Sequence, residues 1–436
     1  MNRRKFFSPA IRVALAWLLL AVSVLAESWY KGNLHTHSFW SDGREFPEMV
    51  AVWYRDRGYH FMAFTDHHVT QTGEKWANIT TAEKAYGVIA ACQKRFGPDS
   101  VITRQEGEKI LAKLKTFPEV QKLVEEPGRF LLLQGEEITA RYLNVPVHVN
   151  AINLYTPVAA LKEKDTTTTL IANVKAALEA LKQEKNQGIV VINHPNFHYA
   201  LTAEDLAETD ACFFEVYNAH PGSNNEGDSK HPDTEKMWDI ASSLRLLKWK
   251  KPPLFGLATD DSHHYHEFAP NRANPGRAFV MVRARELTVP EIIAALQRGD
   301  FYASSGVILQ EVRYEARERK LVVQVQPEKD THYRIDFIGT TIDAEARPET
   351  VLAPESVPEE QSLQKAPGRF TGRYRPQIGH VFLSVKGTSA TYTLTGKELY
   401  VRAVVTSDRP VPWLPPEEGI YQKAWTQPVG WPQANH

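Results

Sequence analysis

Apolar runs and helical stretches alternate along the chain up to about residue 300, which is the pattern of an α/β domain. Short uninterrupted apolar runs are typical of strands that are buried on both faces, as in a parallel sheet. We expect a first strand to end at residues 33–35 and further strands at residues 61–64, 130–133, 147–154, 189–192, 213–216, 254–258 and 278–282. Helices are predicted at residues 46–57, 171–185 and 288–296.

The pattern changes near residue 305, where short strands with alternating apolar and polar residues replace the β/α pattern. Residues 345–367 are crowded with Pro and Glu and predict a long loop. The chain is therefore expected to comprise a barrel domain at residues 27–305 and a small antiparallel β-sandwich domain at residues 306–436. The strands expected in the second domain are residues 320–325, 333–338, 380–385, 391–394 and 399–405.

Residues 76–127 interrupt the β/α pattern with a segment rich in Lys, Glu and Ala, which is far longer than an ordinary connection. We expect a helical insertion there. A lid above the barrel mouth and a solvated helical pair both remain open for this segment.

The first 26 residues have the form of a signal peptide, with a basic start, an apolar stretch from Val13 to Leu25 and a small residue, Ala26, at the cleavage position. Export to the periplasm or the exterior is therefore expected. The Arg3-Arg4 pair fits the twin-arginine route and an ordinary Sec leader alike. No later segment is long enough to span a membrane, so no span is expected once the leader is removed.

Charge and cysteine content exclude some classes of protein. The net charge is −1, and it becomes −5 without the four basic residues of the leader. A basic footprint for nucleic acid is absent, and no nucleic-acid partner is expected. The chain has two cysteines, and Cys212 lies in an apolar run, which favours a free buried thiol over a disulfide with Cys92.

Histidines and acids gather at the ends of the predicted strands. His35 and His37 are two residues apart on one strand, so their side chains face the same side and can share a metal. Further candidates of this kind follow the later strands, namely Asp42, Asp66, His67, Glu137, His148, His194, Asp261 and His263. Several such residues in one barrel mouth indicate a polynuclear metal site.

These positions resemble the motifs of the polymerase and histidinol phosphatase (PHP) superfamily over roughly residues 30–285. Those motifs are HxH with a downstream acid, TDH, GxE, a single His, HP and a closing DxH. They read here as HTHSFWSDG, FTDHH, GEEIT, VHVN, INHPN and DDSH. The resemblance implies a distorted (β/α)7-type barrel, two or three bound metals, and hydrolysis of phosphate esters.

The resemblance also assigns roles to individual residues. It implies nine metal ligands, which are His35, His37, Asp42, His67, Glu137, His148, His194, Asp261 and His263. Asp66 would orient a ligating residue without itself binding the metal. Asp260 is an alternative ligand because the acid is doubled, and a satisfied core histidine is the alternative interpretation of His148.

Nine ligands are too many for one tetrahedral ion and suit two or three divalent ions in sites of mixed nitrogen and oxygen character. Zn, Mn and Fe all fit that donor set. Such ions lower the pKa of a bridging water toward about 7, so that hydroxide can attack a phosphate ester. No other nucleophile stands out.

Substrate-facing residues are harder to identify from the sequence. Arg277 precedes a strand and could neutralise a phosphate, as could Arg141, although a surface salt bridge fits either residue equally well. His198 and Asn218 follow strand ends and could line the pocket. We expect a small-molecule or glycan-linked phosphoester as substrate.

Two other functions remain open at this point. Amidohydrolase barrels also begin with HxH, but they usually close with a lone Asp, whereas this chain closes with Asp-Ser-His. A metal-stabilised module that binds glycans or phosphoglycans through aromatic residues of the second domain is the third possibility. Its aromatic candidates are Trp413, Trp425 and Trp431. The sequence leaves open the substrate, the choice between mono- and diesterase, the metal, the oligomeric state and the role of the β domain.

Overall fold

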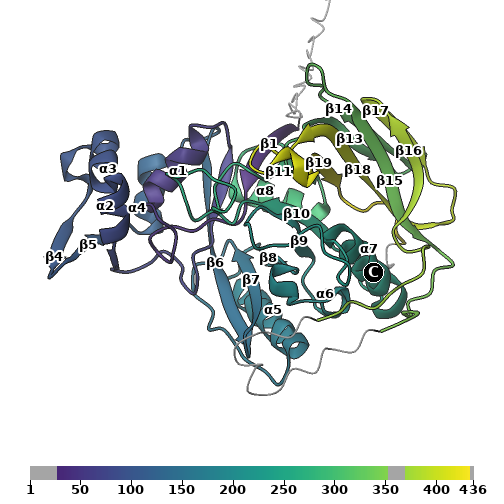
Figure 1. Cartoon of the computed structure of the whole chain (residues 1–436), viewed down its shortest axis with the longest axis horizontal. Helices are drawn as coiled ribbons and strands as arrows, with labels where there is room; N and C mark the ends of the chain where they lie inside the picture. Colours follow the sequence, from purple (N-terminus) through teal and green to yellow (C-terminus); the bar gives the residue numbers. More distant parts are fainter. Residues whose placement is uncertain (1–26, 352–368, 433–436) are drawn as a thin grey trace, which may run out of the picture.

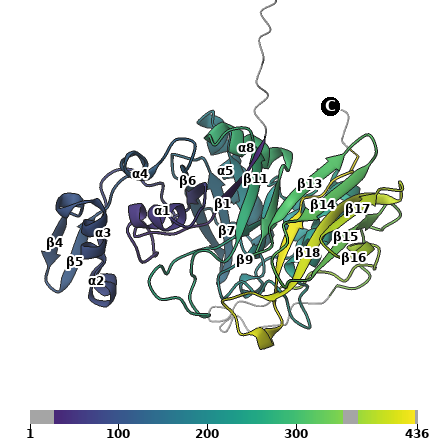
Figure 2. The same ribbon diagram turned by 90° about the horizontal axis from the view of Figure 1, so that it is seen from above.

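The computed structural model describes residues 27–351 and 369–432. The predicted signal peptide lies outside these residues, as does most of the predicted 345–367 loop. The protein is a mixed α/β molecule with one large sheet and two three-stranded sheets. An insertion and a C-terminal β-sandwich lie at opposite ends of the molecule (Figures 1 and 2). Within the described ranges, no helix is both long and apolar enough to traverse a bilayer.

The large sheet is built from the apolar runs that the sequence predicted as strands. Seven strands take the order β10-β9-β8-β7-β6-β2-β1. Their bounds are Phe255–Thr259, Phe213–Asn218, Ile189–Ile192, Val145–Ile152, Leu131–Tyr142, Phe61–Phe64 and Ser28–Asn33. The isolated parallel bridge between Thr36 and Ser262 joins the segment that follows β1 to the segment that follows β10. The two ends of this run of strands therefore approach each other.

A regular sequence of seven β/α units is not confirmed. Strands β6 and β7 form an antiparallel hairpin, and β7 also pairs antiparallel with β8. Leu143, in the turn of the hairpin, has a φ of 52°, a left-handed conformation that allows this tight reversal. Helices follow other strands, namely α1 (Pro47–Arg55), α5 (Thr166–Gln183), α6 (Ala203–Glu208), α7 (Thr234–Leu244) and α8 (Val289–Arg298).

The prediction of a helical insertion at residues 76–127 is wrong for part of the segment. Residues 80–96 and 117–124 are helical, as α2 (Thr80–Tyr86), α3 (Val88–Phe96) and α4 (Phe117–Val124). Strands β4 (Thr103–Glu106) and β5 (Lys109–Lys113) form a hairpin instead, and β3 (Trp76–Asn78) pairs with β5. The hairpin reverses at Gly107, whose φ is 59°, and β5 buries Ala112 against the insertion's helices and the loop after β1.

The C-terminal part is a two-layer antiparallel sandwich, as the alternating pattern predicted. One layer is the sheet of β13 (Leu309–Glu315), β14 (Lys320–Val325) and β17 (Ser389–Thr393). The other layer continues the large sheet through β11 (Phe279–Ala284), β12 (Phe301–Ser304), β19 (Tyr421–Thr426), β18 (Glu398–Pro410), β15 (Tyr333–Thr341) and β16 (His380–Lys386). The domain boundary near residue 305 stays a prediction, since one sheet crosses it.

A buried ion pair fixes the sandwich to the rest of the molecule. Arg402 on β18 is 1 % exposed and donates to both carboxylate oxygens of Asp239 on α7, at 2.9 and 2.7 Å. Tyr400 donates to the same carboxylate at 2.8 Å. The side chain of Gln427 bonds both backbone groups of Gly256 on β10. The two parts therefore share buried polar contacts as well as a sheet.

We predict that Asp239→Ala destabilises the whole chain by about 3–5 kcal/mol, because it leaves the buried Arg402 charge with only its longer contacts to Glu235. Urea denaturation followed by circular dichroism measures this change. Asp300→Ala, which removes the partner of the half-exposed Arg298, is the matched control and should cost less than about 1 kcal/mol. Equal effects of the two variants would contradict a joining role for the buried pair.

Candidate metal centre

The nine predicted ligands come together at one edge of the large sheet. His35 and His37 follow β1, His67 follows β2, and His194 follows β8. Glu137 and His148 lie opposite each other on the β6–β7 hairpin, and Asp261 and His263 follow β10. Because parallel strands end at the same edge, residues more than 200 positions apart in the sequence meet here. The described residues include three overlapping groups with the spacing of metal ligands.

The first group joins the two histidines of the HxH motif to two acids. The Nε2 atoms of His35 and His37 each lie 3.4 Å from Oε2 of Glu137. The same two atoms lie 3.3 and 3.1 Å from Oδ1 of Asp261. A metal held tetrahedrally by nitrogen and oxygen ligands separates neighbouring ligand atoms by roughly 3.4 Å. The two nitrogens and Oε2 of Glu137 therefore have the spacing of ligands of one ion, and Asp261 lies against both nitrogens without completing that group.

The second group uses the other oxygen of the same glutamate. Oε1 of Glu137 lies 3.0 Å from Nδ1 of His148 and 3.4 Å from Nε2 of His194. Since Oε2 faces the first group, the carboxylate of Glu137 is placed to bridge two neighbouring ions.

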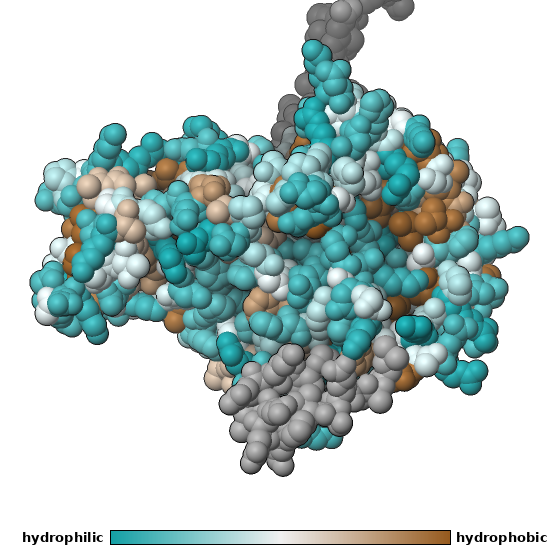
Figure 3. All heavy atoms as spheres, in the orientation of Figure 1, coloured by the Kyte–Doolittle hydropathy of each residue, from teal (hydrophilic) through white to brown (hydrophobic). Residues whose placement is uncertain are grey.

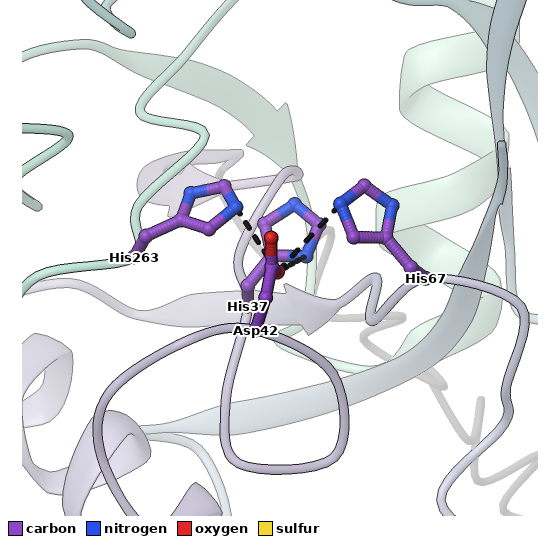
Figure 4. Close-up of side chains that lie close together, drawn as sticks. All are labelled: His37, Asp42, His67 and His263. Atoms are coloured by element: carbon purple, nitrogen blue, oxygen red, sulfur yellow. Dashed lines mark ion pairs between the residues drawn. The ribbon is translucent and has the colours of Figure 1, made fainter. Parts of the chain in front are cut away.

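The third group uses the other ring nitrogen of His37, and Figure 4 shows its four side chains, those of His37, Asp42, His67 and His263, close together. Oδ1 of Asp42 is 3.2 Å from Nε2 of His263, 3.6 Å from Nε2 of His67 and 3.8 Å from Nδ1 of His37. Asp42 is 60 % exposed, unlike Glu137 and Asp261, so this group lies at the solvent side of the cluster.

The donor set fits divalent metal ions. The Nε2 atoms of His35, His37 and His148 are buried and have no hydrogen-bond partner in the described part of the chain. A buried nitrogen without a partner is costly unless a ligand satisfies it. The histidine and carboxylate donors, with no thiolate among them, suit Zn, Mn or Fe. Ligation by these nine residues stays a prediction.

The charges of the cluster place Glu137, His37 and His148 in the protonation states that bind metals, whereas they raise the pKa values of His35, His67, His194 and His263. Burial alone would raise the pKa of Glu137, but the histidines, His67 first among them, outweigh it and hold that pKa well below its usual range. Burial lowers the pKa values of His37 and His148 to about 4 each. Ionised carboxylates and neutral imidazoles are the forms that coordinate divalent ions.

Glu215, for which the sequence suggested no role, holds two of the predicted ligands in place. Its Oε1 lies 2.7 Å from Nδ1 of His35, which leaves Nε2 of His35 for the cluster. Its Oε2 accepts from the backbone N–H of His194 at 2.7 Å and from Asn218 at 2.8 Å. A carboxylate behind a ligating imidazole fixes both its tautomer and its orientation. The signal for this residue was an acid within an otherwise apolar strand.

Asp66 has the position expected of an orienting residue but does not reach the cluster itself. Its carboxylate accepts from the backbone of Ser38, from Gln71 and from the hydroxyl of Ser41. Ser41 in turn lies 3.3 Å from Nδ1 of His37. Asp66 therefore acts on the cluster through Ser41 and the loop after β1.

Asp260, the alternative ligand, is a structural residue. Its carboxylate accepts from Tyr54 at 2.8 Å and from the backbone N–H groups of residues 276–278. These four bonds occupy its oxygens and hold the turn before β11. Only Asp261 of the doubled acid lies within the cluster.

The predicted substrate-facing residues lie in different places. Arg277 donates to the backbone oxygen of Ala269 and to Asn274, and it lines a cavity beside the cluster together with Asn218. His198 is exposed, and its ring contacts Phe197 rather than a ligand. Trp425 is only 2 % exposed and stacks on Tyr217, so it does not present a surface for glycans.

His220 is a residue that the sequence analysis missed. Its ring centroid lies 5.9 Å from that of His263, and its Nδ1 accepts from the backbone N–H of Gly222 at 3.1 Å. That bond assigns the proton of the neutral ring to Nε2. No motif marks His220, because it is brought to the cluster by the loop after β9.

Comparisons with known proteins give remote likenesses of fold. No protein-family model matches the chain, and no curated protein does. A solved two-domain protein from Bacteroides vulgatus, which contains a predicted PHP-like metal-dependent phosphoesterase, is 15 % identical with a TM-score of 0.37. That match covers 87 % of this chain and 90 % of the other.

Two further solved structures match a shorter part of the chain. One is a proposed metal-dependent phosphoesterase from Bifidobacterium adolescentis, 16 % identical with a TM-score of 0.30. The other is an amidohydrolase from Chromobacterium violaceum, 13 % identical with a TM-score of 0.27. Each match covers 53 % of this chain and 87 % of the other.

We predict that the purified chain binds two or three divalent transition-metal ions. His148→Ala and His263→Ala remove ligands of different groups, so each should lower the measured stoichiometry by about one. Plasma mass spectrometry after chelator treatment and reloading with Zn²⁺ or Mn²⁺ measures this. His332→Ala, at an 89 % exposed site on the sandwich, is the matched control. Unchanged stoichiometry in both ligand variants would contradict the assignment.

Metal uptake should also depend on pH. Burial lowers the pKa of His67, but the carboxylates of Glu137 and Asp42 outweigh it and raise that pKa to about 9 in the metal-free protein. His67 is therefore protonated at neutral pH and must lose its proton to ligate. Calorimetric titrations in buffers of different ionisation enthalpy should show proton release on binding at pH 7.5, and apparent affinity should rise up to about pH 9. Uptake without proton release would contradict ligation by His67.

Proposed function

We propose that the protein is an exported metal-dependent hydrolase that cleaves phosphate ester bonds at a centre of two or three divalent ions. The observation that carries this proposal is the sharing of ligands between groups. Glu137 belongs to two of the three groups through different oxygens, and His37 also belongs to two. Adjacent ions a few ångströms apart are the arrangement that hydrolyses phosphate esters in many enzymes.

The charge of the loaded centre favours an anionic substrate. Three carboxylates, those of Asp42, Glu137 and Asp261, belong to the cluster, and neighbouring histidines hold the pKa values of all three below their usual ranges. Two ions would leave a charge of about +1 and three a charge of about +3 once these acids are counted. A phosphate ester suits this surplus better than a neutral amide.

Residues of the chain itself would position the candidate ligands and bind the substrate. When bound, divalent ions lower the pKa of water toward about 7 and neutralise phosphoryl oxygens. Glu215 holds the imidazole of His35 and the backbone of His194, and Asp66 holds the loop that carries His37. His220, with its Nε2 proton, is placed to donate a hydrogen bond to a substrate oxygen at the mouth.

Export is the second part of the proposal and rests on the leader-like sequence of residues 1–26. The twin-arginine and Sec routes are both compatible with it. An exported enzyme would meet substrates of the cell envelope or the medium.

We predict metal-dependent hydrolysis of p-nitrophenyl phosphate, of its bis ester, or of both. His194→Ala and Asp261→Ala should each lower kcat/KM by about 100-fold or more, since each removes a ligand. Arg277→Ala should raise KM and leave the metal content unchanged. Steady-state kinetics with parallel metal analysis measures these effects, and His332→Ala again serves as the control. A fully metallated protein that is inert toward phosphoesters yet cleaves amides or lactones would favour the amidohydrolase alternative.

A further inference from the structure

Two adjoining cavities extend from the metal centre toward the C-terminal sandwich. The inner cavity has a volume of about 270 Å³ and is lined by Asn218, His220, Glu226, Arg277, Trp413 and Glu418, among others. The outer cavity has a volume of about 620 Å³ and shares Arg277 and Trp413 with the inner one. The shared lining makes the two cavities one groove.

The inner end of the groove touches the candidate ligands. Asn218 donates to Oδ2 of Asp261 at 3.2 Å, and the ring of His220 lies beside that of His263. A group that occupies the inner cavity would therefore stand next to a phosphoryl group held at the centre. This is the position of the leaving group, the alcohol released on hydrolysis.

Aromatic rings line the groove along its length. Trp413 is half-buried, and the guanidinium of Arg277 lies 5.9 Å from its ring. Farther out, Trp53 stacks on Phe268, with ring centroids 6.2 Å apart and planes 19° apart, and the guanidinium of Arg57 lies 4.2 Å from the Trp53 ring. Contacts within the protein therefore occupy the Trp53 ring, and Phe268 is the exposed ring of this pair. Phe268 is 57 % exposed, which is costly for a phenyl ring that contacts water only. Flat, partly exposed rings in a row are the surface on which the C–H faces of sugar rings stack.

The polar groups of the groove discriminate between possible ligands. Glu226 and Glu418 line the inner cavity, and their carboxylates accept hydrogen bonds from hydroxyl groups. The same carboxylates would repel the phosphates of a nucleic-acid strand, the other ligand that stacks on aromatic rings. A polyhydroxylated, uncharged chain fits both the rings and the acids.

We propose that this groove binds a saccharide, and that the substrate is a phosphate ester of a sugar or oligosaccharide whose sugar part lies on Trp413. The assignment of the ester rests on the proposed function, whereas saccharide binding in the groove does not. Trp413 belongs to the 411–420 connection between β18 and β19. The C-terminal sandwich thus contributes a wall of the substrate site, which gives it a role in specificity.

Binding is tested with the full-length, metal-loaded chain and three neutral probes, maltotriose, cellotriose and chitotriose. Saturation-transfer NMR and calorimetry should detect at least one of them. Trp413→Ala should weaken that binding about tenfold or more, and Trp413→Phe, which keeps a flat ring, should retain most of it. Trp249→Ala, at a half-exposed site that lines neither cavity, is the matched control. Binding of none of the probes, or binding that is unchanged in Trp413→Ala, would overturn the proposal.

Kinetics distinguishes this proposal from the function on which it partly rests. Trp413→Ala should lower kcat/KM for glucose 6-phosphate at least tenfold more than it lowers kcat/KM for ethyl phosphate, with the metal content unchanged. An equal loss on ethyl phosphate would show a general disturbance of the centre and would overturn the sugar assignment. The chain could also bind a saccharide through Trp413 and yet hydrolyse no phosphoester. That result would support saccharide binding in the groove and refute the proposed reaction.

Discussion

The histidine and carboxylate cluster can be buried only if its charges are balanced. Glu137 and Asp261 are almost completely enclosed, and their nearest polar neighbours include imidazoles that are themselves shielded from water. In the metal-free chain these imidazoles compete for protons, so some pKa values rise while others fall to about 4. A divalent ion in each group would remove that competition, because it would satisfy the carboxylates and the unpartnered nitrogens together. The buried charges of the cluster could therefore be balanced by bound metal ions.

Three buried acids that are not candidate ligands hold the segments around the cluster in place. Asp66 fastens the loop after β1, Glu215 fastens His35 and the backbone at His194, and Asp260 fastens the turn before β11. They tie together segments that are up to 206 residues apart in the sequence. His194 and Asp261 have φ values of 23° and 48°, which non-glycine residues rarely adopt. Such conformations persist where surrounding contacts fix them, as these carboxylates do.

The strands, and the convergence of the candidate ligands at one sheet edge, could be predicted from the sequence because each leaves a local signal. An apolar run of four residues such as 61–64 marks a buried strand, and a histidine directly after such a run marks the sheet edge. The roles of Asp260 and His220 leave no such signal, and the acid within an apolar strand at Glu215 does not show what it binds, because each role depends on partners from distant segments. The hairpin at residues 103–113 was missed for another reason. Its composition resembles that of a solvated helix, and its strand pairing with β3 decides the structure.

The position of the sandwich bears on how substrates are selected. Its inner layer is one sheet with the strands that carry the ligands, and the buried Arg402–Asp239 pair fixes its orientation. Apolar residues form a patch on the surface of the sandwich, at the right of Figure 3. The 411–420 connection leaves this sheet and brings Trp413 to the cavity that Asn218 and His220 also line. Under the proposed function, a substituted sandwich would change which substrates are accepted and leave the candidate ligands in place, since none of the candidate ligands belongs to it.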